Sequence, residues 1–132
     1  AIAANKDILN VFEPGSHGST FGGNPLGAAV SIKAMERLVR DNYPKQAEEK
    51  GNYFMSKLRE IKNDDIVEIR GKGLLIGVEF KINAAPYVKK LIENGVLAKE
   101  THERTIRFAP PIVTTYEQLD DACEKIKKAF TK

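Results

Sequence analysis

A run of glycines and hydroxyl side chains at residues 15–26, directly before a helix start, constrains this chain most strongly. The run reads Gly-Ser-His-Gly-Ser-Thr-Phe-Gly-Gly-Asn-Pro-Leu. Asn24 suits a helix N-cap, and Pro25 suits the first turn because its missing N–H would have no partner there. Glycines let backbone N–H groups approach a ligand closely, and hydroxyls add donors, so this segment can hold a phosphate. On composition alone, an ordinary connecting loop is the commoner meaning of such a run.

Apolar residues at helical spacing predict four main helices. The longest begins at Asn24 and reaches about Asn42, because no proline interrupts it after its first turn and its apolar residues form a wide face. Asn94 and Gly95 are typical of the end of a helix. The predicted helices cover residues 24–42, 44–62, about 87–93 and about 119–130, after a short helical turn at 6–12.

Alternating apolar residues between Val67 and Phe80 predict a β-hairpin, with residues 71–73, Gly-Lys-Gly, as its turn. Two short strands are expected near residues 96–99 and 105–108, and the second ends before two prolines, which cannot donate to a ladder. A small sheet with helices that cover one of its faces is typical of a layered α+β fold. The predicted fold class is therefore α+β, a small antiparallel sheet with helices packed on one side.

Composition bounds the partners of this chain. Its 132 residues, 42% hydrophobic and 30% charged, can bury one modest core. The net charge of +3 arises from interleaved basic and acidic residues, which argues against a nucleic-acid surface. No apolar run approaches the roughly 18 residues of a membrane span. The single cysteine, Cys123, excludes an internal disulfide and fits a reducing cytoplasm.

Other site motifs fail on spacing. Gly-Lys-Gly at 71–73 is followed by Ile76 where a dinucleotide fingerprint needs glycine, and by no Ser or Thr where a P-loop needs one. His17 and His102 lie far apart, and no second cysteine supports a zinc site. No nucleophile elbow is present for serine chemistry. We therefore expect no metal site and no serine triad.

Three segments together carry a resemblance to a known family. Residues 14–26 resemble the signature of the class III, fold-type I aminotransferases, which use pyridoxal 5′-phosphate (PLP). Residues 67–79, Val-Glu-Ile-Arg-Gly-Lys-Gly-Leu-Leu-Ile-Gly-Val-Glu, resemble the hairpin of their C-terminal domain. Residues 95–102, Gly-Val-Leu-Ala-Lys-Glu-Thr-His, and 106–111, Ile-Arg-Phe-Ala-Pro-Pro, resemble the final strands of the ornithine aminotransferase branch.

The resemblance implies a domain organisation. Residues 1–42 are expected to form the end of the large PLP-binding domain and a long connecting helix, and residues 43–132 the C-terminal small domain. In this family the active sites form between two subunits, so a homodimer is expected. The lysine that forms the Schiff base lies upstream of the part that matches Ala1. No catalytic residue is therefore expected in this chain, and Lys72 is expected in a solvated turn.

The resemblance also implies binding residues. Thr20, with Ser19 as a helper, matches the residues that contact the PLP phosphate of the partner subunit. The alternative is that Thr20 only caps its loop. Arg107 matches the arginine that binds a substrate carboxylate, since a guanidinium engages a carboxylate through two parallel hydrogen bonds. From the residues alone, a structural ion pair is the other role open to Arg107.

The function implied for the complete protein is transfer of the δ-amino group of ornithine to 2-oxoglutarate, which gives glutamate-5-semialdehyde and glutamate. An acetylornithine or related class III aminotransferase is the first alternative. A catalytically silent remnant or pseudo-subunit is the second, because no lysine of this chain matches the Schiff-base position. We expect a cytoplasmic protein with no nucleic-acid or membrane partner.

Overall fold

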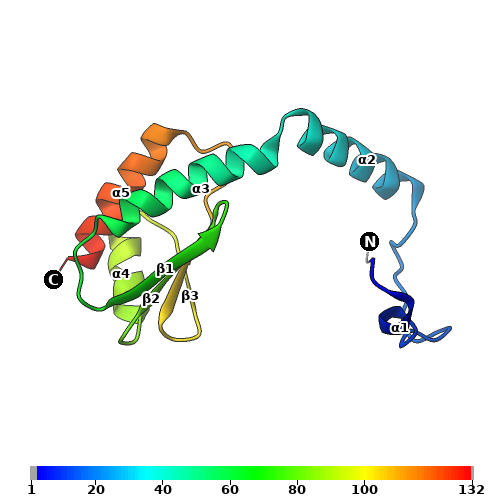
Figure 1. Cartoon of the computed structure of the whole chain (residues 1–132), viewed down its shortest axis with the longest axis horizontal. Helices are drawn as coiled ribbons and strands as arrows, with labels where there is room; N and C mark the ends of the chain where they lie inside the picture. The colour runs from blue at the N-terminus through cyan, green and yellow to red at the C-terminus, as the bar shows by residue number, and fades with distance from the viewer. Residues whose placement is uncertain (1–2, 132) are drawn as a thin grey trace. The chain divides into compact units, whose positions relative to one another are not determined.

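The computed structural model describes residues 3–131, which form two compact units that divide between Arg40 and Asp41. Figure 1 draws the elements in chain order. The division falls two residues before the boundary expected at residues 42 and 43. Whether the first unit is the end of a larger domain stays a prediction. No helix within the described residues is both long and apolar enough to cross a membrane.

The first unit contains the helices α1 (Lys6–Leu9) and α2 (Pro25–Arg40). Asn24 is the N-cap of α2, as predicted, since its Oδ1 accepts from the backbone N–H of Gly27 at 2.7 Å. A Cβ at Gly27 would lie 2.8 Å from Asn24 Nδ2, so this glycine leaves room for the cap. The helix ends at Arg40, two residues earlier than predicted, and Asn42 then has a left-handed φ of 50°.

The second unit contains a four-stranded antiparallel sheet in the order β1-β2-β4-β3. The predicted hairpin turn at residues 71–73 begins two residues too early, because Gly71 and Lys72 still pair with Ile76 and Leu75. The turn lies at residues 73–74, where Gly73 has a φ of +55°. The strands are β1 (Ile66–Lys72), β2 (Leu75–Phe80), β3 (Lys99–Thr101) and β4 (Thr105–Phe108).

The third strand also begins later than predicted, at Lys99 instead of Val96. The reason is local: the N–H of Val96 donates to the carbonyl of Leu91 at 2.9 Å, and Gly95 has a φ of +78°. This is the hydrogen bonding that closes a helix C-terminus, so the chain at Val96 still completes the preceding helix. Asn94 is its C-cap, as predicted.

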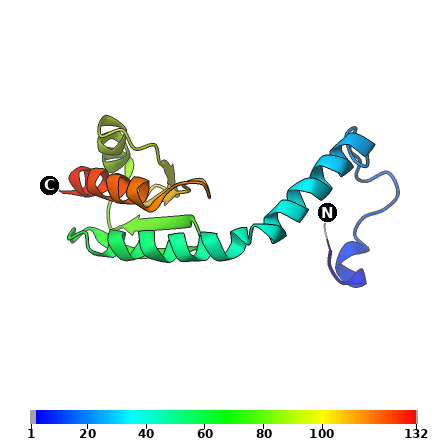
Figure 2. The same cartoon turned by 90° about the horizontal axis from the view of Figure 1, so that it is seen from above.

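Three helices cover the buried face of the sheet: α3 (Tyr43–Arg59), α4 (Ala85–Glu93) and α5 (Tyr116–Phe130). A capping box starts α5, in which the Thr115 side chain accepts from the N–H of Gln118 and the Gln118 side chain accepts from the N–H of Thr115. Figure 2 shows α3 running beside β1. The predicted α+β class with an antiparallel sheet is confirmed.

The core of the second unit lies between one face of the sheet and these helices. Alternate residues of β2 and β4 are buried, and they pack against apolar side chains of the three helices. The opposite face of the sheet carries mostly charged, polar or glycine positions, together with the exposed Leu75. The fully buried large side chains are Phe80, Phe130, Leu58, Ile76, Leu91, Ile106, Leu119, Ile126 and Val78.

Candidate functional site

The glycine loop before α2 is exposed, and two of its three hydroxyls are engaged locally. The Oγ of Ser16 accepts from the N–H of Glu13 at 3.1 Å, and the Oγ of Ser19 accepts from the N–H of Gly22 at 3.0 Å. The Thr20 hydroxyl has no hydrogen bond within residues 3–131. A hydroxyl that accepts still has its own proton to donate. Ser19 and Thr20 can therefore both donate to a ligand, and only Ser19 also supports the loop.

The backbone of this loop is open to an approaching group. A Cβ added at Gly15, Gly18 or Gly23 would meet nothing within 4 Å, so no side chain covers these positions. Gly15 and Gly23 have φ angles of +85° and +75°, which other residues adopt at a cost. Exposed N–H groups and unengaged hydroxyls are the donors that a phosphate accepts from. The donor set of this loop fits a phosphate.

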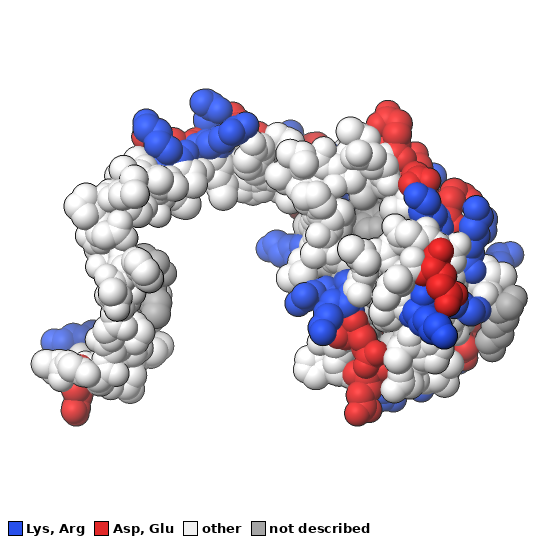
Figure 3. Space-filling model, turned by 180° about the vertical axis from the view of Figure 1, so that it is seen from behind, with Lys and Arg blue, Asp and Glu red and all other residues white. Residues whose placement is uncertain are grey.

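The unit that carries this loop leaves its apolar side chains uncovered. Among the described residues 3–40, none is buried. On the face drawn in Figure 3, charged side chains are interleaved over the second unit, whereas those of α2 gather along one side of the helix and leave other surface of the first unit uncharged. Monomers seldom expose so many large apolar side chains on so short a segment, which favours an interaction surface here. The exposed large apolar side chains of the unit are Ile8, Val11, Phe12, Phe21, Leu26, Val30, Ile32, Met35, Leu38 and Val39.

Arg107, the second predicted site residue, lies on the open face of the sheet. It is exposed, and its cross-strand neighbours are Gly77 on β2 and Lys99 on β3. Within residues 3–131 its guanidinium has neither an ion pair nor a hydrogen bond. An unpaired guanidinium beside a residue without a side chain is accessible to a carboxylate. The structural ion pair that was left open has no carboxylate partner in this part of the chain.

A shallow hollow of about 350 Å³ surrounds Arg107 on this face. Its lining also includes Arg70, Thr101 and Thr105. Gly77 lies between Arg70 and Arg107, since it is the cross-strand partner of both. A Cβ at Gly77 would make ordinary contact at 3.4 Å with Thr105 Cγ2, so packing alone does not require glycine there. Glycine inside a strand is typical of places where a ligand or another backbone comes close.

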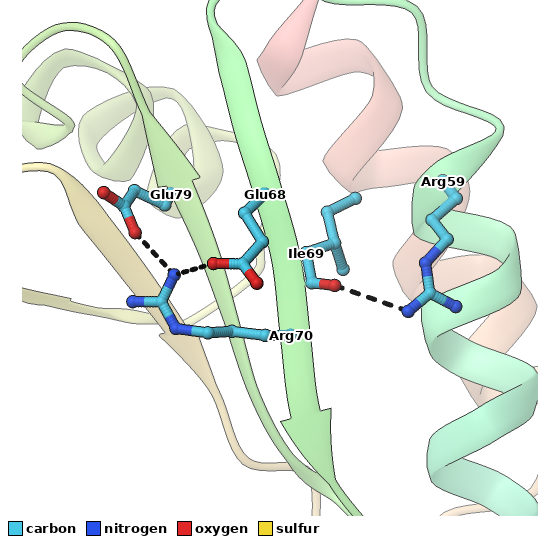
Figure 4. Close-up of polar contacts among 5 residues, drawn as sticks. All are labelled: Arg59, Glu68, Ile69, Arg70 and Glu79. Carbon is cyan, nitrogen blue, oxygen red and sulfur yellow. Dashed lines mark hydrogen bonds and ion pairs between the residues drawn. The ribbon is translucent and has the colours of Figure 1, made fainter.

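Arg70 is held by two carboxylates, which Figure 4 shows. Its Nη1 lies 2.5 Å from an Oε2 of Glu79 and 2.7 Å from an Oε2 of Glu68. Hydrogen bonds to Glu79 and then to Glu68 raise the pKa of the Arg70 guanidinium. Arg59 also donates to the backbone carbonyl of Ile69 at 3.3 Å and so ties α3 to β1 (Figure 4). The cluster of Glu68, Arg70 and Glu79 carries one negative charge beside Arg107.

Sequence reasoning missed this cluster because it placed the hairpin turn at residues 71–73. A three-residue turn there would pair residue 68 with residue 76 and leave Glu68 opposite an isoleucine. The observed register instead sets Glu68 opposite Glu79 and Arg70 opposite Gly77. Glu68, Arg70 and Glu79 thus share one face of the sheet. Placing a two-residue turn at residues 73–74, which begins at the second glycine of the pair, would have predicted the observed register and so revealed the cluster.

Cys123 lies in the helical layer of the second unit, and not on the sheet face that carries Arg107. It is buried between α3 and α5, as predicted for a core residue. Burial, together with the nearby Asp120 carboxylate, raises the pKa of the Cys123 thiol to about 12. The Tyr53 hydroxyl donates to Asp120 at 2.5 Å. Within the described residues, no three His, Cys, Asp or Glu side chains gather as a metal site would require.

Comparison with known proteins identifies the family. Residues 1–130 match the family model for class III aminotransferases. An ornithine aminotransferase from Geobacillus sp. (strain WCH70) is 58% identical over 129 residues, which are 98% of this chain and 32% of that protein. One from Brevibacillus brevis is 59% identical over 130 residues, 98% of this chain and 33% of that protein.

Solved structures agree with this fold. The ornithine aminotransferase of Toxoplasma gondii crystallised with oxidised glutathione superposes with a TM-score of 0.79 at 45% identity, over 94% of this chain and 30% of that one. The acetylornithine aminotransferase of Elizabethkingia anophelis also gives a TM-score of 0.79, at 42% identity, over 96% of this chain and 35% of that one. The chain belongs to the class III aminotransferases, and it spans about a third of the length of the ornithine aminotransferases that it matches.

Proposed function

We propose that this chain is the C-terminal part of a PLP-dependent ornithine aminotransferase. The complete enzyme transfers the δ-amino group of ornithine to 2-oxoglutarate and forms glutamate-5-semialdehyde and glutamate. The observation that carries this proposal is the 58% identity to an ornithine aminotransferase over 98% of the chain. The lysine that binds the cofactor covalently belongs to the remainder of the enzyme, so the chain alone is inactive.

The glycine loop supplies part of the cofactor site in this proposal. Thr20 donates to the PLP phosphate of the partner subunit, and Ser19 helps. The unengaged hydroxyl of Thr20 and the uncovered glycine backbone around it support this role. PLP, when bound, serves as the electron sink for the amino-group transfer. The residues of this loop contribute binding and position only.

Arg107 binds a substrate carboxylate in this proposal. Its guanidinium is exposed and unpaired among residues 3–131, and Gly77 beside it leaves space for a small ligand. Lys99 pairs with Arg107 across the sheet and belongs to the segment that distinguishes the ornithine branch by resemblance. A sequence difference between the ornithine branch and its relatives in that segment would therefore lie directly beside the arginine proposed to bind the carboxylate.

The same proposal includes a cytoplasmic homodimer with residues 1–42 as the end of its large domain. The uncovered apolar side chains of α2 support an interface there, since monomers seldom expose so much apolar surface. The remainder of the enzyme and a second subunit would cover this surface. Light scattering on the complete enzyme tests the dimer.

The alternative with specific support is acetylornithine as the amino donor, because a structure with that name matches as well by TM-score. A silent remnant is the other alternative. The test is to express the complete reading frame that contains this chain and to measure PLP-dependent glutamate formation with each donor. Faster turnover of ornithine supports the proposal, and faster turnover of acetylornithine refutes it. A frame without a cofactor-binding lysine supports the remnant.

A further inference from the structure

Glu79 lies on the open face of the sheet between two arginines. The hairpin register places Arg70 opposite Gly77, and the next pair of strands places Arg107 opposite the same Gly77. Glu79 is two residues from Gly77 and therefore on the same face. It is a diagonal neighbour of Arg70 on one side and of Arg107 on the other. Diagonal neighbours on one face have Cα atoms about 7–8 Å apart, within reach of long side chains.

In the structure, however, Glu79 forms an ion pair with only one of the two arginines, Arg70. The Glu79 carboxylate lies 2.5 Å from Arg70 Nη1, while Arg107 has no ion pair within residues 3–131. Gly77 contributes no side chain that could separate Glu79 from Arg107. Without Arg70, the same carboxylate would still have the unpaired guanidinium of Arg107 as a diagonal neighbour of opposite charge.

Glu68, the other carboxylate that pairs with Arg70, cannot reach Arg107. It lies on the edge strand β1, opposite Glu79, so the whole width of β2 separates it from Arg107. Its bond of 2.7 Å to Arg70 Nη1 holds that guanidinium in place above the hairpin. Glu79 is thus the carboxylate of this cluster that can reach either arginine.

From this arrangement we infer that Arg70 is a positioning residue, which holds the Glu79 carboxylate away from Arg107 and so leaves Arg107 free for a substrate carboxylate. The inference rests on the proposed role of Arg107. A purely structural role for Arg70 is the competing explanation. Exposed ion pairs of this kind contribute little to folding, so loss of Arg70 should leave the sheet intact.

Kinetics of the complete enzyme separate these explanations. Arg70→Met should raise the KM for 2-oxoglutarate about five- to tenfold, because Glu79 then pairs with Arg107 and competes with the substrate. The double variant Arg70→Met/Glu79→Gln should return to within about twofold of wild type. Arg70→Lys should retain most of the wild-type behaviour. The kcat in the ornithine half-reaction should change by less than about twofold in each variant.

Lys89→Met is the charge control. Lys89 is exposed on α4, in the helical layer over the other face of the sheet and outside the lining of the hollow, so its removal deletes one positive charge without releasing Glu79. Interactions between exposed charges more than about 10 Å apart are largely screened at ordinary salt. Lys89→Met should therefore leave the KM for 2-oxoglutarate within about twofold of wild type. An increase equal to that of Arg70→Met would overturn the inference in favour of a general charge effect.

NMR of the 132-residue chain tests the same inference without substrate. The Nε–Hε signal of Arg107 should shift in Arg70→Met and return to its original position in the double variant. An unmoved signal, or a double variant as impaired as Arg70→Met, overturns the inference. Arg107→Met tests the proposed function separately. If that variant has wild-type KM for 2-oxoglutarate, the role of Arg107 fails, and the NMR result still decides whether Arg70 restrains Glu79.

Discussion

Gly51 is the position at which one added methyl group should perturb this fold most. It is buried in α3, where the helix crosses the turn between β1 and β2. A Cβ at Gly51 would lie 2.0 Å from the carbonyl oxygen of Gly73. Ala47, one turn earlier, contacts the same turn: a Cβ at Gly73 would meet its Cβ at 3.4 Å. The helix therefore presents a strip of small residues to the turn.

The cost of Gly51→Ala follows from this distance. Ordinary contact begins at 3.4 Å, so relieving the 2.0 Å overlap requires a movement of 1.4 Å (3.4 − 2.0) between backbone and backbone. The movement would loosen Phe54, Met55 and Leu58, which α3 buries in the core. Overpacking costs about 1–3 kcal/mol, and we take the upper end because backbone cannot rotate away. Alanine recovers about 1 kcal/mol of helix propensity, which leaves a net loss of about 2 kcal/mol.

Urea unfolding followed by tyrosine fluorescence measures this loss in the right part of the chain. All four tyrosines lie between residues 41 and 132, so the signal reports the second unit. Gly77→Ala is the control, since its Cβ meets only ordinary contact at 3.4 Å. It should be neutral or stabilising by about 0.5 kcal/mol, because glycine inside a strand is unfavourable. If Gly51→Ala stays within about 0.5 kcal/mol of wild type, the close approach of α3 to the turn is wrong.

Three further predictions concern the candidate sites and the thiol. In the complete enzyme, Thr20→Ala should weaken PLP retention about tenfold or more, because a hydrogen bond to a charged group contributes about 1.5–3 kcal/mol; equilibrium dialysis that finds unchanged affinity would mean that Thr20 only shapes its loop. Arg107→Lys should lower kcat/KM for 2-oxoglutarate about 10–100-fold and that for ornithine less; steady-state rates within about twofold of wild type for both substrates would make Arg107 structural. Cys123, with a folded pKa of about 12, should react with iodoacetamide at pH 9 at least about 100-fold more slowly in the folded chain than in urea. Since this folded pKa lies above the unfolded value, the thiol's contribution to stability is complete below about pH 8.5 and is lost as pH rises toward 12.

Local sequence signals predicted the helices well. The N-cap at Asn24 and the C-cap at Asn94 were correct, because each depends on hydrogen bonds within a few residues. The helix expected at residues 44–62 is α3, which ends at Arg59. The last three residues of the predicted helix, 60–62, lie outside α3, although their composition is compatible with a helix. Helix ends of this kind are decided by the packing that follows, which periodicity does not contain.

Strand register was the weak point, because it depends on turn geometry instead of composition. The segment 71–73 contains two glycines, and either one suits a turn. Only the left-handed φ of +55° at Gly73 and its contact with α3 decide between them. That contact is tertiary and cannot be read from the hairpin alone. This error in the position of the turn concealed the cluster around Arg70, which forms only in the observed strand register.

The two candidate binding residues differ in how far the chain itself prepares them. Arg107 stands on a sheet whose other face is fully packed, so its backbone is held by a core that this chain supplies. Thr20 lies in a unit without a buried residue among positions 3–40, so its loop has no such support from the chain. Ordering a residue costs about 1–2 kcal/mol of backbone entropy, which buried contacts normally offset. The carboxylate contact proposed for Arg107 would therefore form on a preformed surface, whereas the phosphate contact proposed for Thr20 would require the surface that covers the apolar side chains of its unit.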